Sequence, residues 1–275
     1  MTLPLEDAFP RPSVVGIVNV TPDSFSDAGL FLDADAAIAQ GHRLRGSGAA
    51  LVDVGGESTR PGSEGTELDE ELQRVLPVVE ALAGGVPVAI DTSKAEVARR
   101  SLALGAVMVN DVTALRGDPE LAGVVADSAA YLCLMHMLGD PRTMQVDPHY
   151  DDVVAEVASF LEARLEAAVA AGIPEERICL DPGIGFGKAV RHNLELLGRL
   201  DELVALGRPV MVGVSRKRFL GRILGDADAL TGPVSAGVAT SVLAYERGAS
   251  LFRVHDVQEH VEALVAVRAV EGAAG

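Results

Sequence analysis

Short apolar segments alternate with amphipathic segments along the whole chain, and this alternation constrains the fold more than any other feature. Apolar runs bounded by turn residues predict buried strands, because a parallel strand that is covered on both faces needs apolar residues at nearly every position. Eight such strands are expected, at Ser13–Val20, Ala50–Gly55, Pro87–Asp91, Val107–Asp111, Tyr131–His136, Ile178–Asp181, Pro209–Ser215 and Ser250–Asp256.

The segments between the strands have helical periodicity. Several begin at a capping residue such as Asp69 or Ser235 and stop at a glycine such as Gly105 or Gly172. The expected helices are Ala34–Arg45, Asp69–Leu82, Lys94–Leu104, Pro119–Ala126, Asp151–Ala171, Asn193–Leu206, Ser235–Arg247 and Val257–Val270. Strand-then-helix order predicts a parallel sheet. Eight repeats without a change of composition favour a single (β/α)8 TIM barrel over a doubly wound sheet, with residues 1–275 as one domain and 1–12 as an N-terminal extension.

Composition narrows the classes of partner. The chain has 275 residues, of which 48% are hydrophobic, and a formal net charge of −17. Such a charge disfavours nucleic acid and acidic membrane surfaces as partners. No run of 18 apolar residues predicts a membrane span, and the acidic, proline-rich start is unlike a signal peptide. The two cysteines, Cys133 and Cys179, lie in apolar segments, which indicates core packing and a reducing, cytoplasmic compartment.

Every expected strand ends in a side chain that hydrogen-bonds or titrates. In a (β/α)8 barrel the active site lies at the carboxyl ends of the strands. The residues found there are Asn19, Asp53, Asp91, Asn110, Asp111, His136, Asp181, Ser215, Lys217, Arg253 and His255. Asp91, Asn110 and Asp181 together could bind a planar heterocycle that carries N–H donors and ring acceptors, although each alone is more often a helix cap or a buried polar group.

The segment LDPGIGFGKA (Leu180–Ala189) fits neither of two common phosphate-binding motifs. A Walker A loop needs Gly at Pro182 and Ser or Thr at Ala189, and a dinucleotide fingerprint needs Gly at Lys188. A flexible turn is one interpretation. The functional alternative is that the glycines let a flat ligand approach the backbone beside Asp181, with Phe186 covering it.

Two long βα loops follow the first two strands. GGESTRPG (Gly55–Gly62) is rich in glycine and carries Arg60, which is either a solvated surface residue or part of a functional loop. TPDSFSD (Thr21–Asp27) contributes hydroxyls and carboxylates after Asn19. A neutral oxygen ligand such as Asn19 beside a bound diphosphate suits Mg²⁺, whereas the histidines and cysteines lack zinc-ligand spacing.

Cations gather after the last two strands. VSRKRFLG (Val214–Gly221) and FRVHD (Phe252–Asp256) place Lys217, Arg253 and His255 at the corner where barrels commonly bind phosphate. In so acidic a chain, this local concentration of cations indicates an anion site.

These motifs resemble, in order and spacing, those of the dihydropteroate synthase family. The resemblance rests on VNVTPDSFSD, DVGGESTRPG, IDTSKAEVA, VNDV, LCLMHM, LDPGIGFGK, SRKRFLG and RVHDV, from about Ser13 to Val270. It implies a dimeric (β/α)8 barrel that acts in folate synthesis. Such an enzyme condenses 6-hydroxymethyl-7,8-dihydropterin diphosphate with p-aminobenzoate, giving 7,8-dihydropteroate and diphosphate.

The resemblance also implies roles for individual residues. Asn19 matches the Mg²⁺ ligand, and Arg60, Arg253 and His255 match diphosphate contacts. The aminobenzoate side corresponds to Phe25, Thr59, Pro61 and Arg218, the last being Ser in many members of the family. The residues that match the pterin site are Asp91, Asn110, Asp181 and Lys217, with Met135, Gly185 and Phe186 nearby.

The chemistry implied is an SN1-like loss of diphosphate, assisted by Mg²⁺, followed by attack of the aromatic amine. Loops one and two would close over the cation, with Asp27 a candidate to sense the amine or the cation. Two alternatives are a corrinoid-type methyltetrahydrofolate methyltransferase and a non-catalytic pterin-binding relative. The first needs no diphosphate corner, and the second would be expected to have lost the loop or cation residues that this chain keeps.

Overall fold

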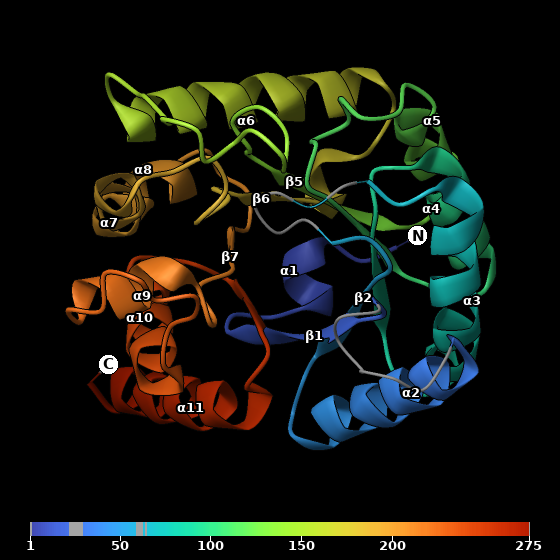
Figure 1. The fold of residues 1–275 in the computed structure, drawn as a ribbon, viewed down its shortest axis with the longest axis horizontal. Coiled ribbons are helices and arrows are strands. Elements are labelled where there is room, and N and C mark those ends of the chain that lie inside the picture. Colours follow the sequence, from blue (N-terminus) through green and yellow to red (C-terminus); the bar gives the residue numbers. More distant parts are fainter. Residues whose placement is uncertain (1, 22–29, 59–62, 64, 275) are drawn as a thin grey trace.

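The chain forms an eight-stranded parallel barrel ringed by helices (Figure 1). The computed structural model describes residues 2–21, 30–58, 63 and 65–274. The strands run in the order β6-β5-β4-β3-β2-β1-β8-β7, and an isolated parallel bridge between Leu180 and Val210 closes the ring. The bounds are β1 Ser13–Asn19, β2 Leu51–Gly55, β3 Val88–Asp91, β4 Met108–Asp111, β5 Tyr131–Met135, β6 Ile178–Asp181, β7 Met211–Val212 and β8 Leu251–Val254. The expected TIM barrel is thereby confirmed.

Helices cover the outer face of the sheet (Figure 1). Their bounds are α1 Leu5–Ala8, α2 Leu30–Gly46, α3 Leu68–Ala83, α4 Ala95–Ala103, α5 Leu121–Ala126, α6 Val153–Ala170, the 3₁₀ turn η2 Glu175–Arg177, α7 Val190–Gly198, α8 Leu200–Val204, α9 Arg218–Ile223, α10 Val234–Glu246 and α11 Val257–Ala274. The helix expected at Asn193–Leu206 is interrupted at Arg199, whose side chain turns to Asp152 at 3.0 Å. Within the described ranges, no helix combines the length and hydropathy needed to cross a membrane.

Strand β7 is much shorter than the segment Pro209–Ser215 predicted for it. Pro209 has no N–H to donate to a ladder, so it can contribute only its carbonyl, which accepts from Leu180 at 2.9 Å. Beyond Val212 the chain enters a turn, in which the Lys217 N–H donates to the Val214 carbonyl at 3.2 Å. The early end of the ladder frees the residues after β7 to face the barrel mouth.

Alternation along the strands separates two cores. On β2, Val52 and Val54 face outward and pack in the large cluster between sheet and helices, while Leu51 belongs to a second cluster inside the barrel. Successive strand residues point to opposite faces, so the next inward position after Leu51 is Asp53. The interior is therefore apolar near the start of the strands and polar near their ends.

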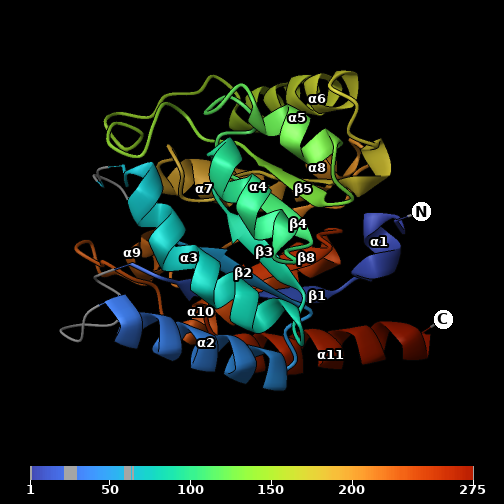
Figure 2. The same ribbon diagram turned by 90° about the vertical axis from the view of Figure 1, so that its right-hand side faces the viewer.

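The segment expected as an N-terminal extension, described here from residue 2 to residue 12, closes the amino end of the barrel. Helix α1 lies beyond that end of the strands (Figure 2) and inserts Leu5, which is fully buried, into the inner cluster. Phe9 packs edge-on against Tyr131, with ring centroids 5.5 Å apart. Cys133 and Cys179 face each other across β5 and β6 in the same cluster, both buried and without a disulfide between them.

Candidate active site

The barrel mouth is organised around Arg253, which projects inward from β8. Its Nε donates to Asp53 Oδ2 at 2.5 Å, and its Nη2 donates to Asp91 Oδ2 at 2.7 Å. Asn110 Nδ2 donates to the same Asp53 oxygen at 3.0 Å. Because an ionised carboxylate only accepts, this contact orients the amide of Asn110 and leaves its carbonyl oxygen for another donor. The ends of four strands, β2, β3, β4 and β8, are thus joined in one polar network.

Asp53 is a member of this network. The sequence predicted its place at a strand end but not a role for it. It is 1% exposed, and its Oδ1 is buried without a hydrogen-bond partner among the described residues. The signal was present in LVDVG, where a carboxylate interrupts an otherwise apolar strand. Such a group is stable inside a protein only when it is paired, and here Arg253 supplies the pairing.

Burial and charge pairing shift the pKa values of Asp91 and Arg253 in this network. Burial raises the pKa of Asp91 to about 7, although the Arg253 guanidinium opposes the shift. Burial also works to lower the pKa of Arg253, but the carboxylates of Asp53 and Asp91 outweigh it and the pKa stays above its ordinary value. Arg253 is therefore permanently charged, while Asp91 changes protonation near neutral pH.

Asp181 ends β6 on the opposite side of the mouth. It is 5% exposed, and its Oδ1 accepts the Gly183 N–H at 2.7 Å. Burial raises the pKa of Asp181, and the hydrogen bond from Gly183 and the charges of Lys217 and Arg253 counteract that rise. Gly183 has φ 64°, and a Cβ there would lie 1.9 Å from the His136 carbonyl oxygen, so only glycine allows this turn.

Lys217 and Phe186 meet beside Asp181. The Lys217 ammonium lies 4.0 Å from the centroid of the Phe186 ring, which is a cation–π contact. A Cβ on Gly185 would lie 3.1 Å from Lys217 Cδ, so the glycine lets the lysine stem pass close to the backbone. Burial, together with the charge of Arg253, lowers the pKa of Lys217 to about 8.

A second buried lysine, to which the sequence assigned no role, fixes the turn that carries Phe186. Lys188 is 3% exposed, and its Nζ lies 2.8 Å from His136 Nδ1 and 2.9 Å from the Phe186 carbonyl oxygen. Burial lowers the pKa of Lys188 to about 7 and that of His136 to about 2. The contact spans two βα loops, so only the folded chain reveals it.

His255, which directly follows β8, lies next to Ser215 in the turn after β7. Its Nδ1 is 3.1 Å from Ser215 Oγ, and the same oxygen accepts the His255 backbone N–H at 3.2 Å. Arg216 leaves the mouth to form a bidentate pair with Asp256, with Nη2 2.6 Å from Oδ1. Within the described residues, Arg218 at the start of α9 is half-buried and forms no ion pair.

An apolar wall flanks the polar network. Met135 at the end of β5 packs with Val112, Met137, Met144 and Phe186 in a small cluster separate from the main core. Gln145 Nε2, from the same loop as Met144, donates to the Gly185 carbonyl at 2.7 Å. The sequence predicted Met135 and Phe186 at the site, but not the methionines of the loop after β5.

Asn19 is the oxygen donor that ends β1. It is half-buried at the mouth, where it lies in register with Gly55 of β2. No three His, Cys, Asp or Glu side chains cluster as a metal site within the described ranges. A single neutral oxygen donor, Asn19, fits Mg²⁺, because this ion keeps several waters and takes its other ligands from substrate phosphates. It does not fit a metal whose ligands all come from the protein.

Five of the predicted site residues, Phe25, Asp27, Thr59, Arg60 and Pro61, lie outside the described residues. The base of the second loop is described. Lys94 Nζ joins Glu57 Oε2 and Glu71 Oε2, each at 2.5 Å, and Arg74 Nη1 donates to the Gly56 carbonyl at 2.7 Å. The segment that leaves β2 is therefore held by α3 and α4 at its base.

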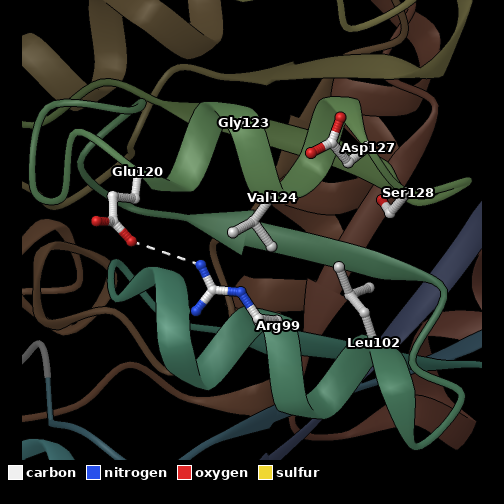
Figure 3. Close-up of a pocket in the computed structure, with 7 residues that line it drawn as sticks. All are labelled: Arg99, Leu102, Glu120, Gly123, Val124, Asp127 and Ser128. Carbon is white, nitrogen blue, oxygen red and sulfur yellow. Dashed lines mark hydrogen bonds and ion pairs between the residues drawn. The ribbon is translucent and has the colours of Figure 1, made fainter.

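A depression on the outside of the barrel is separate from the mouth. It lies between α4 and α5 and is lined by Arg99, Leu102, Glu120, Gly123, Val124, Asp127 and Ser128 (Figure 3). Arg99 and Glu120 approach across it at 3.5 Å as an exposed pair. None of the network around Arg253 lines this depression, so the candidate active site is the mouth.

Comparisons with known proteins agree with this geometry. The family described as "Pterin binding enzyme" matches residues 15–255. The dihydropteroate synthase of Escherichia coli K12 is 45% identical over 263 residues, which cover 94% of this chain and 92% of the relative. A solved Xanthomonas albilineans dihydropteroate synthase with 4-aminobenzoic acid superposes with a TM-score of 0.88 at 49% identity, covering 95% and 94% of the two chains.

A Burkholderia cenocepacia dihydropteroate synthase solved with 7,8-dihydropteroate superposes with a TM-score of 0.85 at 46% identity. It covers 97% of this chain and 94% of its own. The family match, at residues 15–255, includes the carboxyl ends of all eight strands. The chain therefore belongs to the dihydropteroate synthase family of pterin-binding enzymes.

Proposed function

We propose that the chain condenses 6-hydroxymethyl-7,8-dihydropterin diphosphate with p-aminobenzoate at the barrel mouth, releasing 7,8-dihydropteroate and diphosphate. The observation that carries this proposal is the network in which Arg253 joins Asp53 and Asp91 beside Asn110. It combines acceptors for a flat heterocycle with a fixed cation for an anionic leaving group. Relatives solved with 4-aminobenzoic acid and with 7,8-dihydropteroate support the same pair of substrates.

The pterin is assigned to the deeper half of the mouth. The carboxylates of Asp91 and Asp181 would accept N–H groups of the ring, and the free carbonyl oxygen of Asn110 would accept another. Lys217, held against Phe186, is a donor for the ring's carbonyl or nitrogen acceptors. Met135, Gly185 and Phe186 supply apolar and backbone surface for the ring faces.

The diphosphate is assigned to the cationic corner. Arg253 has N–H groups left after its pairs with Asp53 and Asp91, and His255 follows two residues later, just beyond the end of β8. Arg60, which lies outside the described residues, is assigned to the same group by resemblance. Fixed donors aimed at the oxygens that gain charge lower the barrier to departure of the leaving group.

The reaction follows a dissociative course in this proposal. As the C–O bond to the diphosphate breaks, positive charge develops at the exocyclic methylene and spreads into the electron-rich ring, which the buried carboxylates hold. The amine of p-aminobenzoate then attacks the methylene and loses a proton. A dissociative course needs no nucleophilic side chain. The protein has only to orient the two substrates and to exclude water.

Mg²⁺ is the proposed cofactor, with Asn19 as its protein ligand. When bound, the ion would neutralise charge on the departing diphosphate. On the aminobenzoate side, Arg218 offers a donor for a carboxylate at the start of α9. Phe25, Thr59 and Pro61 complete that side by resemblance, and Asp27 is assigned to the amine or the cation.

We further propose a cytoplasmic homodimer. Two buried, unpaired thiols suit a reducing compartment. Apolar side chains that are exposed on α10 and α11, namely Leu243, Val265 and Val270, offer a surface for a second copy. Light scattering after size exclusion tests the oligomer, and a monomer at micromolar concentration would contradict it.

A direct assay tests the activity. The purified chain is incubated with the dihydropterin diphosphate and p-aminobenzoate, with Mg²⁺ or with a chelator, and dihydropteroate is measured by chromatography. Product is expected with Mg²⁺ and strongly reduced product with the chelator. Pterin binding without product would indicate a non-catalytic relative instead.

A further inference from the structure

Ser215 and His255 lie next to each other just beyond the ends of β7 and β8. The β7–β8 ladder pairs Met211 with Leu251 and ends at Val212. Ser215 lies in the turn that follows β7, and His255 directly follows β8. Two contacts join them: His255 Nδ1 lies 3.1 Å from Ser215 Oγ, and the backbone N–H of His255 donates to that oxygen at 3.2 Å. Ser215 is 5% exposed, so water does not compete freely for its hydroxyl.

The partners of the Ser215 hydroxyl favour one tautomer of the His255 ring. The hydroxyl oxygen already accepts the backbone N–H, so its own hydrogen needs an acceptor. Among the described residues, the acceptor within reach is Nδ1 of His255. A neutral imidazole has one donor and one acceptor nitrogen, so a hydrogen bond from Ser215 to Nδ1 leaves the ring hydrogen on Nε2.

The surroundings keep this ring neutral. Burial and the positive charges of Arg253, Arg216 and Lys217 lower the pKa of His255 to about 3, while the Asp256 carboxylate opposes them. Arg216 already pairs with Asp256, which reduces what that carboxylate can do for the ring. At neutral pH the imidazole is therefore a hydrogen-bonding group rather than a cation.

We propose that Ser215 is a positioning residue: it holds His255 in the tautomer with hydrogen on Nε2, so that the ring offers a neutral N–H donor to the departing diphosphate. The diphosphate assignment rests on the proposed function. A neutral donor strengthens its hydrogen bond as the leaving group gains charge. It does so without adding a further positive charge beside Arg253 and Lys217.

His260 provides an internal reference with the opposite tautomer. Its Nδ1 lies 2.7 Å from the Asp256 carbonyl oxygen, which can only accept, so Nδ1 carries the hydrogen. Its Nε2 is buried without a hydrogen-bond partner in the described part of the chain. The two histidines belong to the same segment and differ in what their Nδ1 atoms face.

Nitrogen NMR of the ligand-free protein tests the proposal. Two-bond ¹H–¹⁵N correlation spectra at neutral pH report the tautomer of each ring, with signals assigned from His255→Gln and His260→Gln. We expect Nε2–H for His255 and Nδ1–H for His260. In Ser215→Ala, His255 should become a mixture of tautomers while His260 stays unchanged. A charged or Nδ1–H ring for His255 in the unmodified protein overturns the proposal, even if Ser215→Ala does not fold.

Kinetics of the same variants supply the second readout. Ser215→Ala should lower kcat roughly fivefold, the effect of one misdirected neutral hydrogen bond. Ser215→Thr keeps a hydroxyl and should retain both the tautomer and most of the rate. If the Thr variant behaves like the Ala variant, or if Ala leaves kcat unchanged, the proposal fails. The NMR result does not depend on turnover, so absence of dihydropteroate in the unmodified protein would refute the proposed function separately.

Discussion

The two ends of the barrel are formed by the same strands, but one end is apolar inside and the other is charged. At the amino end, Leu5 and Phe9 fill the interior, and helix α1 closes it (Figure 2). At the carboxyl end, the inward-facing positions carry Arg253, Asp91 and Asp181. Since each strand contributes to both ends, the change of chemistry takes place within two or three inward-facing residues. The amino end stabilises the fold by burying apolar surface. The carboxyl end holds buried charged side chains close together at the ends of rigid strands.

Asp53 marks the boundary between the two ends. It lies one inward-facing position beyond Leu51, which belongs to the apolar layer, and one of its oxygens has no partner among the described residues. The apolar layer below excludes water from the charges above, and this exclusion is the leading cause of the shifted pKa values of Asp91 and Lys217. The inert end therefore contributes to the chemistry of the reactive end through its low dielectric constant.

The largest effect is expected from Arg253→Met, which should damage both stability and activity. Removal of the guanidinium leaves Asp53 and Asp91 buried without their cation, a change that typically costs about 3–5 kcal/mol. Urea unfolding measures the loss, and kcat/KM should fall with it. The stability penalty should be smaller at pH 5 than at pH 8. Burial raises the pKa of Asp91, so this carboxyl group takes up a proton as the pH falls and then needs no cation. A stable, active variant would show that the charged end needs no internal pairing.

Leu5→Ala tests the opposite end and should affect stability alone. Leu5 is fully buried in the inner cluster, so truncation should cost about 3 kcal/mol of unfolding free energy. In conditions where the variant is folded, kcat should change less than twofold. Leu3→Ala is the control, since Leu3 is 60% exposed and should cost under about 0.5 kcal/mol. A large loss of kcat in the folded Leu5 variant would mean that the two ends are not separable.

Asp181→Asn should impair activity with little loss of stability. The amide keeps the size of the carboxylate but loses its charge, so kcat/KM should fall on the order of a hundredfold, or about 2.7 kcal/mol. Asp111→Asn is the matched control. Asp111 is also buried, at the end of β4, but it accepts from Thr113 and Leu115 of its own loop. It should lose stability and keep most of its kcat/KM, and equal losses of activity in the two variants would remove the distinction between site and scaffold.

The fold could be predicted from the sequence because hydrophobic periodicity is local. The exceptions are elements whose formation depends on distant partners. Helix α1 spans four residues, too few for a periodic signal, and it is stabilised by burial of Leu5 inside the barrel. Strand β7 is short because Pro209 cannot donate to a ladder and the chain turns after Val212, and its contact with β6 is an isolated bridge between Leu180 and Val210 that no local pattern encodes.

The meeting of side chains at the mouth could be predicted to the extent that it follows from strand ends. Asp91, Asn110 and Arg253 are polar residues at the ends of apolar runs, and the structure joins them in one network. The contact of Lys188 with His136 could not be predicted, since it requires the close approach of Gly183 to the His136 carbonyl across two loops. The pKa shifts were equally out of reach, because burial of a carboxylate or an ammonium is a property of the assembled barrel.

The dependence of kcat/KM on pH should be the smallest of these effects, and it identifies the titrating groups most directly. If pterin binding requires ionised Asp91 and protonated Lys217, kcat/KM rises as the pH increases through about 7 and falls as it passes about 8. One pH unit beyond either limb should cost about tenfold. Lys217→Arg should remove the alkaline limb because arginine stays charged, and Asp91→Asn should remove the acid limb. A profile whose limbs persist in both variants would assign the titration to the substrates, and the low-dielectric floor of the barrel would then have no part in setting the working pH.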